Sequence, residues 1–299
     1  MKCLFTSDLH GDVARFAALM RVARSERPDG VFVGGDLFRH GHGSEEFAEE
    51  HLLGPIRALR AEADASPGTP GAGPRATGAS PGAPGAGPRW FVILGNDDPR
   101  VFEEAFLAAD AEGLIDYVHE RTVPFGDLFV TGYACVPPTP FHLKDWEKYD
   151  VSRFVDPGAV SPEEGRRSVP VPQHEVRRAT IAADLDALAR NAPPERTIFL
   201  FHAPPYDCAL DRAPLDGRLV DHVPVDVHVG SIAIQRFIAA HQPLVTLHGH
   251  VHESPRLTGR WSERFGRTHA FSGCHDGPGL ALVHFDTDAL DRAGREIVS

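Results

Sequence analysis

Residues 1–36, MKCLFTSDLHGDVARFAALMRVARSERPDGVFVGGD, decide the fold class of this chain. The apolar run CLFT leads to Asp8 and His10, and apolar residues then recur at helical spacing over residues 11–26. The turn sequence Pro-Asp-Gly ends this helix, and the apolar run VFVGG leads to Asp36. A strand, a helix and a second strand in this order predict a parallel β-α-β unit.

The alternation of strands and helices continues beyond this unit. Ser44 is a favourable N-cap for a second helix, and a strand over residues 90–94 follows. Later segments predict strands in LFVTGYACV, TIFLF and PLVTL, helices over 174–191 and 230–241, and strands over 267–272 and 279–285 that finish a second sheet. We therefore expect an α/β fold, a four-layer sandwich of two mixed β-sheets flanked by helices.

One segment breaks this pattern. Residues 65–89 contain ASPGTPGAGPR followed by ASPGAPGAGPR, and they hold no large apolar side chain. A segment so rich in Pro, Gly and Ala cannot offset its ordering entropy by burial, so we expect a flexible surface insertion. The rest of residues 1–299 is expected to form a single domain.

Composition and charge exclude several classes of protein. The formal net charge is −12, so we expect no stable binding to nucleic acid. The four cysteines are scattered without a C-x-x-C pair, and three of them lie within or beside apolar, strand-like stretches, which predicts buried, reduced thiols for those three. No apolar run reaches the roughly 18 residues that span a bilayer, and the N-terminus does not resemble a signal peptide. We therefore expect a cytoplasmic protein without membrane association; the sequence carries no signal for its oligomeric state.

Side chains that bind metals follow five of the predicted strands. They are Asp8 and His10, Asp36, Asn96, His202, and finally His250 and His252. The carboxyl ends of strands in an open α/β sheet converge on one crevice, and Asp-x-His places two ligands on one side of an extended chain. Oxygen and imidazole ligands suit Mn, Fe or Zn and disfavour a thiolate-type structural zinc site. The pattern predicts a centre for two divalent or trivalent metal ions.

The motifs D-x-H, G-D, G-N, H and G-H-x-H, in this order, resemble those of the calcineurin-like metallophosphoesterase superfamily over residues 8–252. The segments FHAPPY and HVGS (228–231) are also similar to a branch of small, stand-alone prokaryotic phosphoesterases. The resemblance implies a metallophosphoesterase-type sandwich and hydrolysis of small phosphate esters by a water or hydroxide activated at the two ions. It also implies two ligand sets, which are Asp8, His10, Asp36 and His252 for one ion, and Asp36, Asn96, His202 and His250 for the other.

The chain departs from that family at one catalytic position. Phosphatases of the family usually read G-N-H-D or G-N-H-E, whereas this chain reads Gly95-Asn96-Asp97-Asp98. A carboxylate acts as a general acid only if burial or a neighbouring like charge raises its pKa. Loss of the imidazole should slow hydrolysis most for esters with poor leaving groups, such as the alkoxide of a phosphomonoester. A diester with a good leaving group needs less help, so we expect a phosphodiesterase. Its catalytic residues would be Asp97, as the candidate general acid, and Asn96, as a contact to the phosphate.

Substrate contacts and alternative functions follow from the same motifs. Arg39 and His42 lie in the loop after Asp36, and His228 follows an extended segment, so these three are predicted to contact substrate. Asp97 disfavours the alternative of a phosphomonoesterase or protein phosphatase. A metal-binding scaffold with vestigial catalysis is a second alternative, which the full ligand set disfavours.

Overall fold

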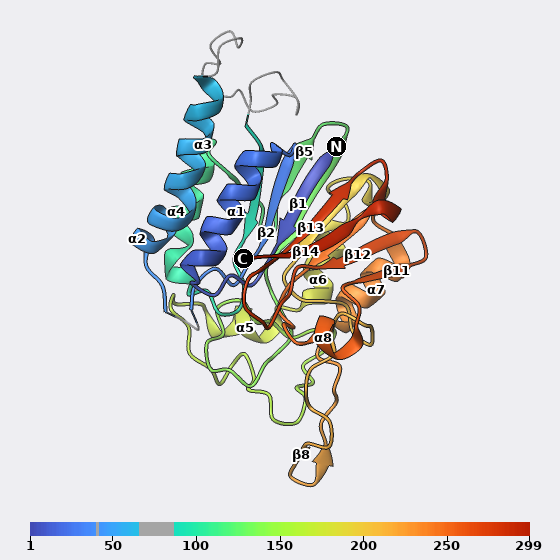
Figure 1. Cartoon of the computed structure of the whole chain (residues 1–299). Coiled ribbons are helices and arrows are strands. Elements are labelled where there is room, and N and C mark those ends of the chain that lie inside the picture. Colours follow the sequence, from blue (N-terminus) through green and yellow to red (C-terminus); the bar gives the residue numbers. More distant parts are fainter. Residues whose placement is uncertain (40–41, 66–86) are drawn as a thin grey trace.

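The computed structural model describes residues 1–39, 42–65 and 87–299. In these residues two six-stranded mixed sheets pack against each other (Figure 1). The first sheet has the order β14 (Gly294–Val298), β13 (Leu280–Asp286), β1 (Lys2–Thr6), β2 (Gly30–Gly34), β3 (Arg89–Ile93) and β4 (Asp116–Tyr117). The second has the order β11 (Ser262–Phe265), β12 (Thr268–Ser272), β10 (Val245–His248), β7 (Thr197–Phe201), β6 (Leu128–Tyr133) and β5 (Thr122–Phe125).

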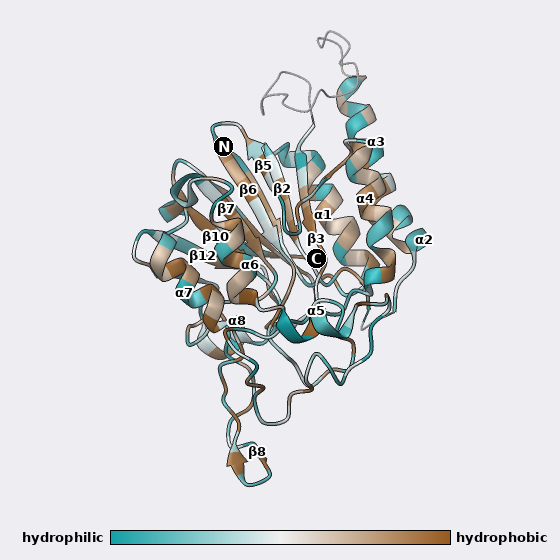
Figure 2. Ribbon diagram, turned by 180° about the vertical axis from the view of Figure 1, so that it is seen from behind, coloured by the Kyte–Doolittle hydropathy of each residue, from teal (hydrophilic) through white to brown (hydrophobic). Residues whose placement is uncertain are grey.

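Helices cover the outer face of each sheet, as Figures 1 and 2 show from opposite sides. On the first sheet lie α1 (Val13–Glu26), α3 (Gly54–Asp64) and α4 (Glu103–Ala111). On the second lie α6 (Ile181–Leu188) and α7 (Ile232–His241). The short helix α2 (Glu45–Ala48) runs through a π-helical turn (Glu49–Leu53) into α3, while α5 (Gln173–Arg178) and α8 (Ser254–Thr258) belong to the connections. The expected four-layer α/β sandwich is therefore confirmed.

The two sheets are held together by an aromatic core. Phe32 of β2 and Phe91 of β3 stack with their ring centroids 4.8 Å apart, and Phe125 of β5 packs edge-on against both rings. A Cβ on Gly30 would lie 2.8 Å from Phe125, so this strand needs a glycine where the sheets approach. Edge-on contacts between buried rings stabilise beyond the area that they bury. Figure 2 shows the apolar residues concentrated on the strands, with hydrophilic residues on the exposed faces of the helices.

Strand direction decides where the site forms. Strands β1 to β4 are parallel, and β6, β7, β10 and β12 are parallel in the other sheet. The carboxyl ends of the central strands β1, β2, β3, β7 and β10 are therefore brought to one edge of the sandwich, where ligands bind in α/β folds.

The structure corrects several boundaries. Strand β13 pairs with β1, so the run predicted at 279–285 completes the first sheet rather than the second. The helix predicted over 174–191 is two helices, since Thr180 caps a new helix after Ala179 leaves the helical conformation. Ser44 does cap the helix predicted there, accepting a bond from Phe47 N.

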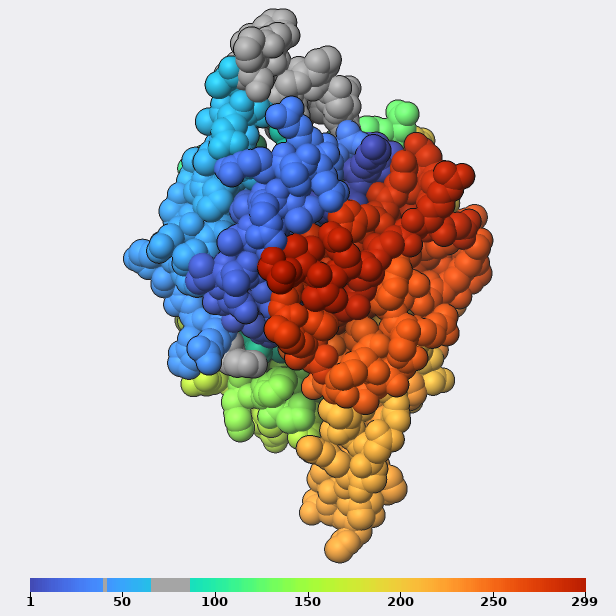
Figure 3. All heavy atoms as spheres, viewed as in Figure 1, coloured from blue at the N-terminus to red at the C-terminus, as the bar shows by residue number. Residues whose placement is uncertain are grey.

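The predicted insertion at 65–89 lies for the most part outside the described residues, although Arg89 already belongs to β3. A two-stranded hairpin, β8 (Leu219–Val220) and β9 (Val223–Pro224), was not predicted and projects from the body (Figures 1 and 3). All four cysteines are buried and free, whereas burial was expected for three of them. Within the described ranges, none of the helices has both the length and the apolar character needed to cross a membrane.

Candidate metal centre

The candidate ligands sit in sharp turns at the strand ends. Asp8, His10, Asp36 and His250 have φ values of 60°, 48°, 52° and 75°, in the left-handed region that is uncommon for residues other than glycine. Strained backbone of this kind concentrates at functional sites, where surrounding structure holds it. The close packing extends to Gly95, where a Cβ would lie 2.2 Å from Asp36 Oδ1. These turns bring the side chains of the candidate ligands close to one another.

Four predicted ligands, Asp8, His10, Asp36 and His252, form the first cluster, which we call the outer group. Each offers one ligand atom within 4.8 Å of the others. The Nε2 atoms of His10 and His252 are 2.8 Å apart, and His252 Nε2 lies 3.2 Å from Asp8 Oδ1. Asp36 Oδ2 is 3.9 Å from His10 Nε2. The chain thus brings together all members of the set predicted for one ion.

Asp36, His202 and His250 form the second cluster, which together with Asn96 we call the inner group. His202 Nε2 lies 3.3 Å from Asp36 Oδ2 and 3.0 Å from Asn96 Oδ1, while the His202 and His250 rings are 5.3 Å apart. Asp36 thus belongs to both groups, so an ion in either group would have its carboxylate as a ligand.

The donor set fits such ions. His202 Nδ1 lies 2.8 Å from Gly34 O, so this nitrogen carries the proton and leaves Nε2 as the ligand atom. Metal-binding histidines are usually oriented in this way, by a hydrogen bond from the second ring nitrogen. Buried carboxylates are otherwise costly, and Asp8 and Asp36 are both buried. Carboxylate, amide and imidazole donors are those that Mn, Fe and Zn accept.

Protonated histidines balance the buried carboxylates in the metal-free protein. Burial lowers the pKa of His202, but the carboxylate of Asp36 outweighs it and raises that pKa to about 10. Burial also lowers the pKa of His252, but the nearby carboxylate of Asp8 outweighs burial and raises that pKa to about 9. Burial lowers the pKa of His250 to about 3, and the charge on His202 reinforces this. In the metal-free protein the two protonated imidazoles, His202 and His252, therefore offset the negative charges of Asp8 and Asp36.

Asp97 and Asp98 have different surroundings although they are adjacent. The backbone N–H of Asp97 donates to Asp36 Oδ1 at 2.9 Å, and its Oδ2 lies 3.5 Å from His10 Nδ1. Asp98 is buried and accepts backbone N–H bonds from Leu37, Phe38 and Gly95 at 3.1, 2.8 and 2.9 Å. Asp97 thus faces the outer group, while Asp98 ties the turn after β2 to the turn after β3.

The three predicted substrate contacts are placed differently. Arg39 and His42 are exposed, and their backbones pair with each other across the loop after β2. Arg39 also lies against Gly11, next to the ligand His10. His228 lies on the long connection between β7 and α7, and its Nδ1 is 2.7 Å from the buried carboxylate of Asp211. No sequence pattern indicated Asp211, because only the folded connection brings it to His228.

A further group of metal-binding residue types, His119, Glu120 and Cys135, does not fit an ion. The backbone N–H of Ala134 donates to His119 Nδ1 at 3.1 Å, so the ring proton sits on Nε2, the nitrogen that would have to bind. Burial and the nearby Lys148 lower the pKa of His119 to about 3, and Lys148 Nζ already lies 2.7 Å from Glu120 Oε1. This group is a hydrogen-bonded cluster.

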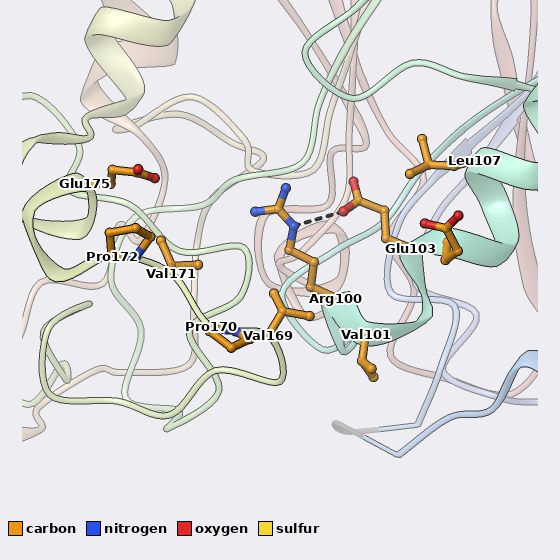
Figure 4. A pocket seen from close by; sticks show the side chains of 10 residues that line it. Arg100, Val101, Glu103, Leu107, Val169, Pro170, Val171, Pro172 and Glu175 are labelled. Carbon is orange, nitrogen blue, oxygen red and sulfur yellow. Dashed lines mark hydrogen bonds and ion pairs between the residues drawn. The ribbon is translucent and has the colours of Figure 1, made fainter.

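A pocket of about 430 Å³ lies between Arg100 at the start of the segment that leads into α4 and the residues 169–172 (Figure 4). It is lined by residues of the start of α4 and of the Val-Pro-Val-Pro segment 169–172. Arg100, which faces it, is paired with Glu103 at 2.9 Å and packs over the ring of Trp146 at 5.2 Å. Its guanidinium is thus held within the wall, and none of the predicted site residues lines this pocket.

One family model and one solved structure agree with this fold. The family model for calcineurin-like phosphoesterases matches residues 1–254. The protein TT1561 of Thermus thermophilus is 16% identical and has a TM-score of 0.57, covering 100% of this chain and 99% of its own. The phosphopantetheinyl hydrolase of Mycobacterium tuberculosis is 14% identical with a TM-score of 0.48, covering 92% of this chain and 89% of its own. The search of curated proteins found no match to this chain. The chain belongs to the calcineurin-like phosphoesterase family.

Proposed function

We propose that this chain is a metal-dependent phosphodiesterase. The outer and inner groups would hold two ions of Mn, Fe or Zn, with Asp36 between them. When bound, such ions would supply Lewis-acid activation of water and would neutralise charge on the phosphate. Asn96 would contribute its side-chain amide to the phosphate as well as its oxygen to an ion. The substrate would be a small phosphate ester.

The position of the Asp97 carboxylate is the observation that carries the preference for diesters. Its Oδ2 lies 3.5 Å from His10, so a negative charge borders the outer group where relatives of the phosphatase type carry a histidine. A phosphomonoester brings up to two negative charges to this border and a diester brings one, so Coulomb repulsion disfavours the monoester more. With Asp97 in place of the histidine, this position also lacks the imidazole that would protonate a poor leaving group.

A paired assay tests this proposal. Protein loaded with manganese is given a bis-aryl phosphate diester and the corresponding aryl monoester, and kcat/KM is measured for each. We expect the diester to be hydrolysed with the higher kcat/KM. A higher value for the monoester would contradict the proposed specificity, and no metal-dependent hydrolysis of either ester would contradict the proposed activity.

Two variants at position 97 separate charge from acid chemistry. Asp97→Asn removes the charge and keeps the size, so it should raise kcat/KM for the monoester by roughly tenfold, the effect of about 1.4 kcal/mol of repulsion. Asp97→His adds an imidazole as well and should raise monoester turnover further, chiefly in kcat. If neither variant changes the ratio of diester to monoester activity, Asp97 does not decide specificity.

A further inference from the structure

We infer that Cys274 is a positioning residue for Asp8 and that it adjusts the affinity of the outer group for its ion. This inference rests on the proposed function. Cys274 follows β12 and lies beyond residues 1–254, the part that the family model matches. Its Sγ donates to Asp8 Oδ2 at 3.2 Å, and both residues are buried.

The two oxygens of Asp8 have separate partners. Oδ1 accepts the backbone N–H of His250 at 3.0 Å and lies 3.2 Å from His252 Nε2, so it faces the ligands. Oδ2 points to the thiol of Cys274, which is not a member of either ligand group. The thiol therefore restricts rotation of the carboxylate and keeps Oδ1 directed at the outer group. A thiol is a weak donor, but in a buried place no water competes with it.

The loop that carries Cys274 is itself fixed to the site. Arg15 donates from Nη1 to the backbone oxygen of Asp8 at 2.7 Å and from Nη2 to Gly277 O at 2.9 Å, so one guanidinium joins the ligand turn to this loop. The N–H of Gly273 donates to His248 O at 3.0 Å, and Arg295 donates to the backbone oxygen of Cys274. These bonds hold the sulfur at a defined place behind Asp8.

Metal titration of the purified, metal-free full chain tests the inference. Manganese and zinc are titrated calorimetrically into wild type, Cys274→Ala and Cys274→Ser. Partners that orient a ligand are typically worth 10–100-fold in affinity, so Cys274→Ala should weaken one of the two binding steps by about that factor. The other step should change little, because the inner group lacks Asp8. Serine retains a donor and should recover most of the loss.

Cys208→Ala is the matched control. Cys208 is also buried, and its thiol donates to Pro205 O at 3.0 Å instead of to a ligand. Circular dichroism checks that each variant is folded; if Cys274→Ala is not, Cys274→Val replaces it as the donor-free variant. Unchanged affinity in the folded donor-free variant, or equal weakening in Cys208→Ala, would overturn the inference.

Two further results would distinguish a failure of the proposed role of Cys274 from a failure of the proposed phosphodiesterase activity. A thiolate-to-cobalt charge-transfer band in the cobalt-loaded protein, lost in Cys274→Ser, would make the sulfur a ligand and would overturn a positioning role. Conversely, wild type that binds two ions with the expected dependence on Cys274 but hydrolyses no phosphate ester would contradict the proposed function alone.

Discussion

The inner and outer groups share Asp36 but differ in their exposure to solvent. In the inner group the side chain of His202 is 0% exposed, Asn96 is buried and only His250 is partly exposed, whereas in the outer group His10 and His252 are 16% and 28% exposed. The inner group is also the one whose turns are tied together by the buried carboxylate of Asp98. An ion in the inner group would therefore be shielded by protein, and one in the outer group would face the solvent and the substrate.

Two neighbouring groups of ligands can thus form two unequal sites. The oxygen ligands come from the turns after β1, β2 and β3 of the first sheet, and most imidazoles come from the turns after β7 and β10 of the second. Each group needs both sheets, so it forms only when the sandwich has packed. Variants that remove a ligand from one group alone can therefore separate a shielded inner ion from a more exchangeable outer one.

Replacement of the shared ligand should have the largest effect. Asp36→Asn keeps the size of the side chain but removes the charge that both groups use, so we expect loss of both ions. Hydrolysis should fall on the order of 1,000-fold or more, as when a principal catalytic group is removed. Metal content by elemental analysis and kcat/KM for the aryl diester check this. Retention of the cellular function in Asp36→Asn, despite lost hydrolysis, would favour a scaffold over an enzyme.

Single variants of the two groups should have smaller and unequal effects. His252→Gln removes a direct ligand, so it should weaken the outer ion by about 100-fold or more, the upper end of the loss typical of partners that only orient a ligand, and leave the inner ion in place. His202→Gln should do the reverse. Because the inner ligand is buried, His202→Gln should also lower the melting temperature of the loaded protein, whereas His252→Gln should change it little. The release of metal ions to a chelator, followed over time, measures this difference between the two groups. We expect two phases in wild type, one for each ion. A single phase in all three proteins would remove the distinction between the groups.

The ligands were predictable from the sequence because each follows its own apolar run. Asp8, Asp36 and His202 needed only a strand and its carboxyl end, both of which are local features. The distinction between the inner and outer groups was not predictable, since it depends on which turns the packing of the two sheets leaves open. The left-handed conformation of Asp8 and Asp36 was likewise hidden, because neither residue type demands it.

Contacts between distant parts of the chain account for what was missed. The runs at 267–272 and 279–285 look alike in sequence, yet one joins β10 and the other joins β1, and partner choice is not a local property. Asp98 and Cys274 have roles that exist only through contacts with Leu37 and Asp8. For Cys274 one signal was available, because it follows a predicted strand just as the ligands do.

The dependence of stability on pH should give the smallest effect and should distinguish the groups once more. In the metal-free protein the pKa of His252 is raised to about 9 and that of His202 to about 10, above the 6.5 expected when the chain unfolds. The folded state therefore binds protons that the unfolded state releases between these values. The stability that this contributes is fully present below pH 6.5 and is lost as pH rises through 9 and 10.

The melting temperature of the metal-free protein should thus fall by several degrees between about pH 6.5 and 10. The loaded protein should lack this fall, because imidazoles that bind a metal carry no proton on the ligating nitrogen. His252→Gln should remove the part of the fall centred near pH 9 and keep the part near pH 10. His174→Gln, at a side chain that is 72% exposed, is the control and should leave the curve as in wild type. Parallel curves for metal-free and loaded protein would mean that protons and metals do not compete for these two histidines.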